Sequence, residues 1–106
     1  MSSDSQLFVP AETILQEAQR LVYGPRQDSY GHPFDDFSRT AAIVTAILGN
    51  KLKDGEQVVA EEVGLIQMAV KISRQVNHPK RDNMVDAAGY AATIQMVIEE
   101  RKRREG

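Results

Sequence analysis

The sequence predicts an all-α, single-domain protein of four helices. Apolar residues recur at three- and four-residue spacing in four segments, and proline or glycine marks most segment ends. No stretch alternates with a period of two for long enough to predict a strand. At 106 residues the chain can build one hydrophobic core but not two. We therefore expect residues 1–9 to form a flexible N-terminus and residues 10–106 a single helical domain.

Composition narrows the class of protein. The formal net charge of -2 gives no reason to expect a general nucleic-acid or membrane binder. The absence of cysteine excludes a disulfide framework, a thiolate nucleophile and a cysteine zinc site, and it suits a reducing cytoplasm. No apolar run approaches the roughly 20 residues that span a bilayer, and the first residues do not resemble a secretory signal. A soluble, cytoplasmic protein without a membrane partner is expected.

Prolines and glycines bound the first two predicted helices. Helix one is expected over residues 10–23, opened by a proline and ended by a Gly-Pro pair. Helix two is expected over residues 33–48, again with proline at its start and glycine after its end. Residues 26–33 between them are predicted to form a loop. This loop is rich in side chains that form hydrogen bonds, namely Arg26, Asp28, Ser29, Tyr30 and His32.

The third and fourth helices are predicted to form a central antiparallel hairpin. Helix three spans about residues 59–76 and carries two neighbouring apolar stripes, so we expect it to be largely buried. Helix four begins at about Asp82 and continues into the C-terminal tail. A short loop with Pro79 joins the two. Gly89 lies inside helix four, where glycine costs roughly 1 kcal/mol relative to alanine, so close packing or a ligand is expected beside it.

Charged residues lie on the seam of this hairpin, where apolar residues are expected. Antiparallel pairing places Lys71 level with Asp86 and Arg74 level with Asp82. Asp82 either caps helix four or belongs to a site. Asp86 lies one turn further into an apolar helix, where a carboxylate needs a cation, a metal or several donors to offset desolvation. The seam is either a structural ion-pair network or the centre of a functional site.

Acidic residues outside the seam also have two interpretations. Asp35 and Asp36 either favour the dipole at the start of helix two, or one of them joins His32, Glu61 or Glu62 in a pocket that binds Mg²⁺ through carboxylate oxygens. His32 itself fits a loop or capping role better than that of a general base.

Three stretches carry a resemblance to known proteins. A Tyr-Gly pair precedes an acidic, aromatic helix start, and two charged motifs follow in the hairpin. They are Tyr30-Gly31, Lys71-x-x-Arg74 and Arg81-Asp82-Asn83-x-x-Asp86-x-x-Gly89-Tyr90. Together they resemble a family of small phage-encoded proteins of unassigned function, over nearly the whole chain. That family is in turn distantly similar to the MazG-type all-α nucleoside triphosphate pyrophosphohydrolases, mainly through residues 82–90.

The resemblance implies a four-helix MazG-like bundle and Mg²⁺-dependent hydrolysis of a (deoxy)nucleoside triphosphate to monophosphate and pyrophosphate. It implies metal binding by Asp82 and Asp86. Cations replace the enzyme family's other acidic pair at Lys71 and Arg74, where they would either grip phosphate or neutralise the aspartates. Glu62 and Asp36 are candidate replacement ligands for Mg²⁺.

The sequence thus yields one leading hypothesis and two alternatives. A MazG-like hydrolase, or a nucleotide-binding relative, would act as a homodimer or higher homo-oligomer in the cytoplasm, which is the host's if the chain is phage-encoded. Its catalytic residues would be Asp86, Asp82, Lys71 and Arg74, and its nucleotide-binding residues Tyr30, His32, Lys71, Arg74, Asn83 and Tyr90. One alternative is a non-catalytic helical interaction protein whose seam charges are structural. The other is a small DNA-binding regulator that uses the basic tail, residues 101–104.

Overall fold

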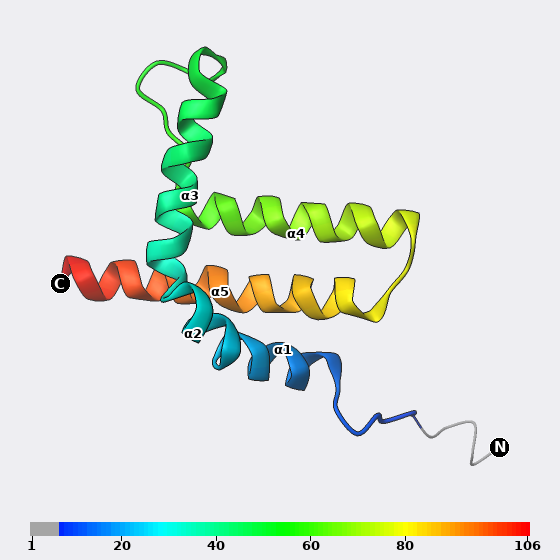
Figure 1. Ribbon diagram of the computed structural model, residues 1–106. Coiled ribbons are helices and arrows are strands. Elements are labelled where there is room, and N and C mark those ends of the chain that lie inside the picture. The colour runs from blue at the N-terminus through cyan, green and yellow to red at the C-terminus, as the bar shows by residue number, and fades with distance from the viewer. Residues whose placement is uncertain (1–6) are drawn as a thin grey trace.

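The computed structural model describes residues 7–106, and this part of the chain is helical without any strand (Figure 1). The elements are α1 (Ile14–Val22), α2 (Pro25–Tyr30), α3 (Pro33–Leu48), the 3₁₀ turn η2 (Gly49–Lys51), α4 (Ala60–Asn77) and α5 (Arg81–Glu105). The all-α prediction is confirmed. The helices α1, α3, α4 and α5 correspond to the four predicted ones, and α2 is an additional short helix. Of the predicted N-terminal segment 1–9, residues 1–6 lie outside the described residues.

The α4–α5 hairpin is the framework on which the other helices pack. The two helices run antiparallel side by side, α1 lies along α5, and α3 crosses the hairpin near the start of α4 (Figure 1). The second half of α3 projects beyond α4. The molecule is consequently elongated, with principal extents of 61 × 34 × 23 Å.

Two predicted boundaries near the N-terminus were wrong. α1 begins at Ile14 and not at Pro10, because Thr13 and Gln16 form a capping box that satisfies the free amides of the first turn. The Thr13 hydroxyl accepts a hydrogen bond from the Gln16 amide, and the Gln16 side chain accepts one from the Thr13 amide. Residues 25–30 form α2 where a loop was predicted, since Pro25 opens a helix as readily as it ends one.

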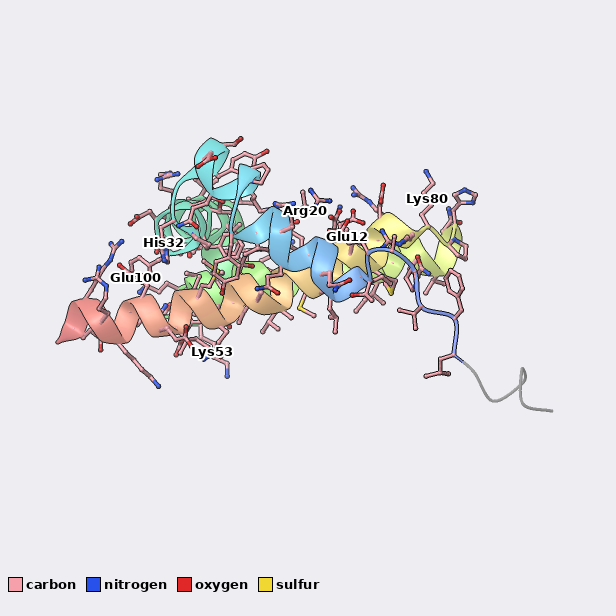
Figure 2. The ribbon with its side chains drawn as sticks, turned by 90° about the horizontal axis from the view of Figure 1, so that it is seen from below. Glu12, Arg20, His32, Lys53, Lys80 and Glu100 are labelled. Carbon is pink, nitrogen blue, oxygen red and sulfur yellow. The ribbon has the colours of Figure 1, made fainter. Side chains whose placement is uncertain are left out.

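The predicted capping role of His32 is confirmed. His32 (labelled in Figure 2) is the N-cap of α3, and its Nδ1 accepts a hydrogen bond from the Phe34 amide at 3.0 Å. Asp35 and Asp36 follow in the first turn, where the positive end of the helix dipole favours carboxylates.

The core is small and lies where α3 meets the hairpin. Phe37 and Ala41 of α3 pack with Ala60, Val63 and Val97, all of them buried. The two long helices also cross closely: a β-carbon at Gly64 would lie 2.3 Å from Ile94 Cγ1. At Gly89 a β-carbon would lie 3.3 Å from Val22 Cγ2 of α1, so close packing accounts for this glycine.

The prediction that helix three is largely buried was wrong for half of its surface. α5 covers the face of α4 that carries Val63 and Gly64. On the opposite face Leu65, Ile66 and Ile72 are about half exposed, at 56%, 49% and 52%. The face of α4 that meets α5 is thus covered and the opposite face is not, because the described chain supplies a partner for only one of them.

Candidate functional site

The seam between α4 and α5 contains one of the two predicted ion pairs. Lys71 Nζ lies 2.9 Å from Asp86 Oδ2, and the two side chains are only 18% and 26% exposed. The predicted register of the hairpin is therefore confirmed. No carboxylate within residues 7–106 lies within 4.0 Å of the Arg74 guanidinium, although Asp82 was its predicted partner. Both residues are exposed near the open end of the hairpin, where water solvates each charge.

Asp82 does not cap α5. Lys80 occupies the N-cap position without a side-chain cap, and Asp82 is the second residue of the helix. Arg81 instead fixes the start of α5 to α1, because its guanidinium pairs with Glu17 and donates to the Glu12 carbonyl at 2.9 Å. Asp82 can still stabilise α5 through its negative charge near the positive end of the helix dipole.

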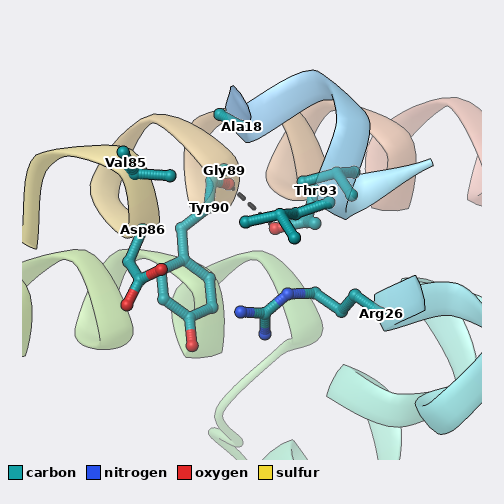
Figure 3. Close-up of a pocket in the computed structure, with 9 residues that line it drawn as sticks. Ala18, Arg26, Val85, Asp86, Gly89, Tyr90 and Thr93 are labelled. Carbon is teal, nitrogen blue, oxygen red and sulfur yellow. Dashed lines mark hydrogen bonds between the residues drawn. The ribbon is translucent and has the colours of Figure 1, made fainter. Parts of the chain in front are cut away.

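Beside the seam lies a cleft between α1, α2 and α5, which we call the Arg26 cleft. It consists of two adjoining cavities that share Val22, Arg26, Tyr90 and Thr93 in their linings. Asp86 and Gly89 line the first cavity (Figure 3). The second cavity is lined by Gln27, Tyr30, Gly31, Pro33, Asp36 and Phe37 in addition to the shared residues. The cleft therefore brings together four predicted site residues, namely Tyr30 of α2, Asp36 of α3, and Asp86 and Tyr90 of α5.

Arg26 and Tyr90 dominate the geometry of the cleft. The Arg26 guanidinium carbon lies 5.6 Å from the centroid of the Tyr90 ring, a cation–π distance, and Figure 3 shows the side chain extended towards that ring. The ring also contacts Phe37 of the core, with centroids 6.3 Å apart. One turn along α5, the Thr93 hydroxyl donates to the Tyr90 carbonyl at 3.0 Å. Tyr90 is thus a supported wall against which Arg26 rests.

Arg26 is partly buried, and the described part of the chain places no carboxylate within 4.0 Å of it. A guanidinium withdrawn from water without an anionic partner favours the binding of an anion, especially one that accepts two parallel hydrogen bonds. The cavities beside it have volumes of about 10 and 20 Å³, roughly the space of one water molecule. A larger ligand therefore requires the Arg26 side chain to rotate away from Tyr90.

The other predicted site residues lie elsewhere. Arg74 and Asn83 line a separate hollow at the α4–α5 turn. Asn83 is 8% exposed, and its Nδ2 donates to Gln75 Oε1 at 3.1 Å, a contact that fixes the turn. Nδ1 of His32 is already used in capping α3. Glu62 Oε1 accepts from the Val59 amide at 3.0 Å, at the start of α4.

The carboxylates do not assemble into a metal site within one chain. Across residues 7–106, no three His, Asp or Glu side chains converge in a way that could hold a metal ion. The seam aspartate Asp86 is neutralised by Lys71, and Glu62 is engaged at the start of α4. Asp35 and Glu61 are bound by arginines of the tail. The donor set thus does not fit the Mg²⁺ site that the resemblance implies, and that site stays a prediction.

The basic tail of α5 is tied back onto the chain. Arg104 contacts Asp35 at 2.9 Å and Glu100 at 2.8 Å, and Arg101 pairs with Glu61. Arg104 also lies over the Phe34 ring, 4.5 Å from its centroid. Hydrogen bonds from these arginines lower the pKa of the Asp35 and Glu61 carboxyl groups. Lys102, Arg103 and Arg104 are exposed, but Arg103 and Arg104 pair with Glu100 and Asp35, so much of the tail's positive charge is neutralised within the chain.

Acid should loosen this tail. Hydrogen bonds from Arg103 and Arg104 lower the pKa of Glu100 to about 2 from an ordinary 4.5. A lowered folded-state pKa stabilises the fold above the unfolded-state value, and this stabilisation disappears as the pH falls from about 4.5 to about 2. We expect Glu100→Gln to melt below wild type at pH 7 and at the same temperature near pH 2, in thermal unfolding followed by circular dichroism. A melting difference that persists unchanged at pH 2 would contradict the ionic role of Glu100.

Sequence reasoning did not select two residues of the cleft, Arg26 and Thr93. Arg26 stood in the polar segment 26–33 and was noted only as one hydrogen-bonding side chain among several. Its partner Tyr90 is far away in sequence, so nothing local could indicate the contact. Thr93 was visible one turn after Tyr90 on the same helical stripe, and that periodicity was the available signal.

The fold and the cleft define a small all-helical protein in which a partly buried arginine, without a carboxylate partner among residues 7–106, lies in a cleft beside a charged helix hairpin. The chain belongs to the family described as "Domain of unknown function (DUF6378)", whose model matches residues 13–98. It is similar to the Gene 55 protein of Mycobacterium phage D29, with 34% identity over 91 residues. That alignment covers 85% of this chain and 56% of the phage protein, so the chain spans little more than half the relative's length.

No solved structure matches the chain. The matches to this family and to the phage protein confirm the predicted resemblance to a phage-encoded family of unassigned function. In the described residues, no helix is long and apolar enough to cross a membrane.

Proposed function

We propose that the Arg26 cleft binds a nucleoside triphosphate and that the protein is a nucleotide-binding relative of the MazG-type pyrophosphohydrolases. The observation that carries the proposal is Arg26, a partly buried residue whose guanidinium lies over the face of Tyr90 and more than 4.0 Å from any carboxylate of residues 7–106. Arginine presents a planar fork of donors that matches two phosphate oxygens at once. Nucleoside triphosphates are cytoplasmic metabolites, so the proposal places the protein in the cytoplasm.

The groups around Arg26 support a nucleotide better than a simple anion. When Arg26 turns to a phosphate, it leaves the face of Tyr90 open to a base, and base–aromatic stacking contributes about 1–3 kcal/mol. Tyr30 lines the same cavity and is more than half exposed, so its ring is available for a second contact. Lys71 neutralises Asp86, with Nζ 2.9 Å from Oδ2, and this reduces the repulsion between that carboxylate and a phosphate in the first cavity.

Hydrolysis is a separate part of the proposal. The reaction of the resembled enzymes uses Mg²⁺, and the donor set of one chain does not fit that ion. We therefore assign Arg26 and Tyr90 to binding, with Lys71 as the counter-ion of Asp86, and we route no chemical step through Asp82 or Asp86. Pyrophosphate release, assayed with and without Mg²⁺, tests this part of the proposal separately from binding.

Thermal stabilisation tests the binding proposal directly. A ligand that binds only the folded state, present at tenfold above its Kd, stabilises the protein by about 1.4 kcal/mol. For a domain of this size that raises the melting temperature by several degrees. We expect at least one deoxynucleoside triphosphate at millimolar concentration to produce such a shift, and Arg26→Met to abolish it.

Arg20→Met is the matched control, because Arg20 is an exposed arginine of α1 that pairs with Glu12 outside the cleft. It should keep the wild-type shift. The same shift in Arg26→Met, or no shift with any of the four nucleotides, would refute nucleotide binding in this cleft. Stabilisation without pyrophosphate release would support a nucleotide-binding protein and would refute only the proposed hydrolase activity.

Two observations favour the second candidate, a non-catalytic helical interaction protein. Lys71 and Asp86 neutralise each other, as a purely structural seam requires, and α4 presents an apolar face to solvent. Failure of every nucleotide to stabilise the protein would favour this candidate.

A further inference from the structure

The outward face of α4 is apolar along its length. On the face opposite α5, apolar residues recur at helical spacing, and only Glu62 at the start and Ser73 near the end are polar. The apolar members of this α4 face are Leu65, Ile66, Ala69, Ile72 and Val76, all of them exposed in the single chain. A contiguous exposed apolar face of this kind is typical of an interaction surface. Since α5 covers only the opposite side of α4, this face has no partner within the described chain.

The second half of α3 repeats this pattern. Over residues 41–48 its only polar side chain is that of Thr45. Ile43 and Ile47 are 61% and 75% exposed, on the part of the helix that projects beyond α4 (Figure 1). Thr45 itself is used internally: its hydroxyl accepts from the Val58 amide at 2.9 Å. Exposed apolar side chains therefore lie on two neighbouring helices, although α1 and residues 7–9 expose others.

The total surface shows how much is left uncovered. The chain exposes 7694 Å², whereas a compact monomer of its mass exposes about 5,900 Å². Half of that difference already equals the roughly 800 Å² that each partner contributes to a stable protein interface. The radius of gyration of 17.1 Å also exceeds the ~13 Å of a compact domain of this length. Part of this excess comes from residues 7–9, which lie outside the helices and are 75–89% exposed, and part from the uncovered faces of α3 and α4.

We propose that a second copy of this chain packs on the outward face of α4 and the adjoining second half of α3, forming a closed symmetric dimer. The face carries a single charge, Glu62, at its edge, so two copies can meet across it without repulsion of like charges. An interface that resembles a divided core is typical of homodimers, and twofold pairing is their commonest symmetry.

Mass in solution tests the proposal. The full chain should sediment at twice 11.8 kDa at 10 µM. Leu65→Lys combined with Ile72→Lys should weaken association at least 100-fold and give a monomer. Leu15→Lys combined with Tyr23→Lys is the matched control, because these residues of α1 are equally exposed but lie outside the face. The control should remain dimeric.

A second measurement keeps the proposal falsifiable if the lysine variants unfold. The chain has no cysteine, so Ser73→Cys places one thiol on the α4 face and Gln19→Cys places one on α1. A short bismaleimide should join two Ser73→Cys chains and leave Gln19→Cys uncoupled. A monomer at 100 µM, equal coupling of both variants, an open-ended series of assemblies, or dissociation only in the α1 variant would overturn the proposal.

Discussion

Phe37→Ala is expected to lower the free energy of unfolding by about 3–5 kcal/mol, the cost of truncating a buried aromatic side chain. Phe37 is 7% exposed and lies where α3 meets both helices of the hairpin. Its ring also supports Tyr90 of the cleft, with centroids 6.3 Å apart. The core contains few large side chains, so its neighbours cannot close the cavity by small movements. The loss would be a large share of the roughly 5–15 kcal/mol that stabilises a typical domain.

Urea unfolding followed by circular dichroism measures this loss. Phe8→Ala is the matched control, since the same truncation at a side chain that is 89% exposed should change stability by no more than about 0.5 kcal/mol. Phe37→Leu should lose less than Phe37→Ala, because it keeps more of the apolar volume. A loss below about 1 kcal/mol for Phe37→Ala would show that the α3 junction does not hold the fold together.

Lys71→Met is expected to destabilise the protein by about 1–3 kcal/mol, between the values for exposed and fully buried ion pairs. The substitution removes the only cation within 4.0 Å of the Asp86 carboxylate among residues 7–106 and leaves that charge about three-quarters covered. Asp86→Leu alone leaves the Lys71 charge unpaired, whereas the double variant contains neither charge. Asp86→Leu should therefore cost less stability when it is combined with Lys71→Met. The double variant should approach the wild-type stability.

A double-mutant cycle isolates this coupling. Four proteins are compared by urea unfolding: wild type, Lys71→Met, Asp86→Leu and the double variant. A coupling energy above about 1 kcal/mol is expected, and additive losses would contradict a direct interaction. Arg20→Met again serves as the control, since its pair with Glu12 is far more exposed and should matter less.

Local signals account for what could be predicted. Helical spacing of apolar residues, together with proline and glycine at the ends, placed α3, α4 and α5 within about one residue of their observed bounds. Where two local signals competed, the prediction failed. Pro10 suggested an earlier start for α1, but the capping box at Thr13 satisfies more backbone groups. The pair of Gly24 and Pro25 suggested a stop, although it also begins α2.

The sequence by itself determined the helical class, the hairpin and the pairing of Lys71 with Asp86, because a short connection and helical periodicity leave almost no choice of register. Only the tertiary structure brought Arg26 to Tyr90 and left it without a carboxylate, and only it tied Arg104 to Asp35. These contacts join residues more than 60 positions apart. Their geometry depends on how α1, α2 and α3 pack on the hairpin, which no local pattern encodes. The same packing left the outward face of α4 uncovered, and it is this face that we assign to a second copy of the chain.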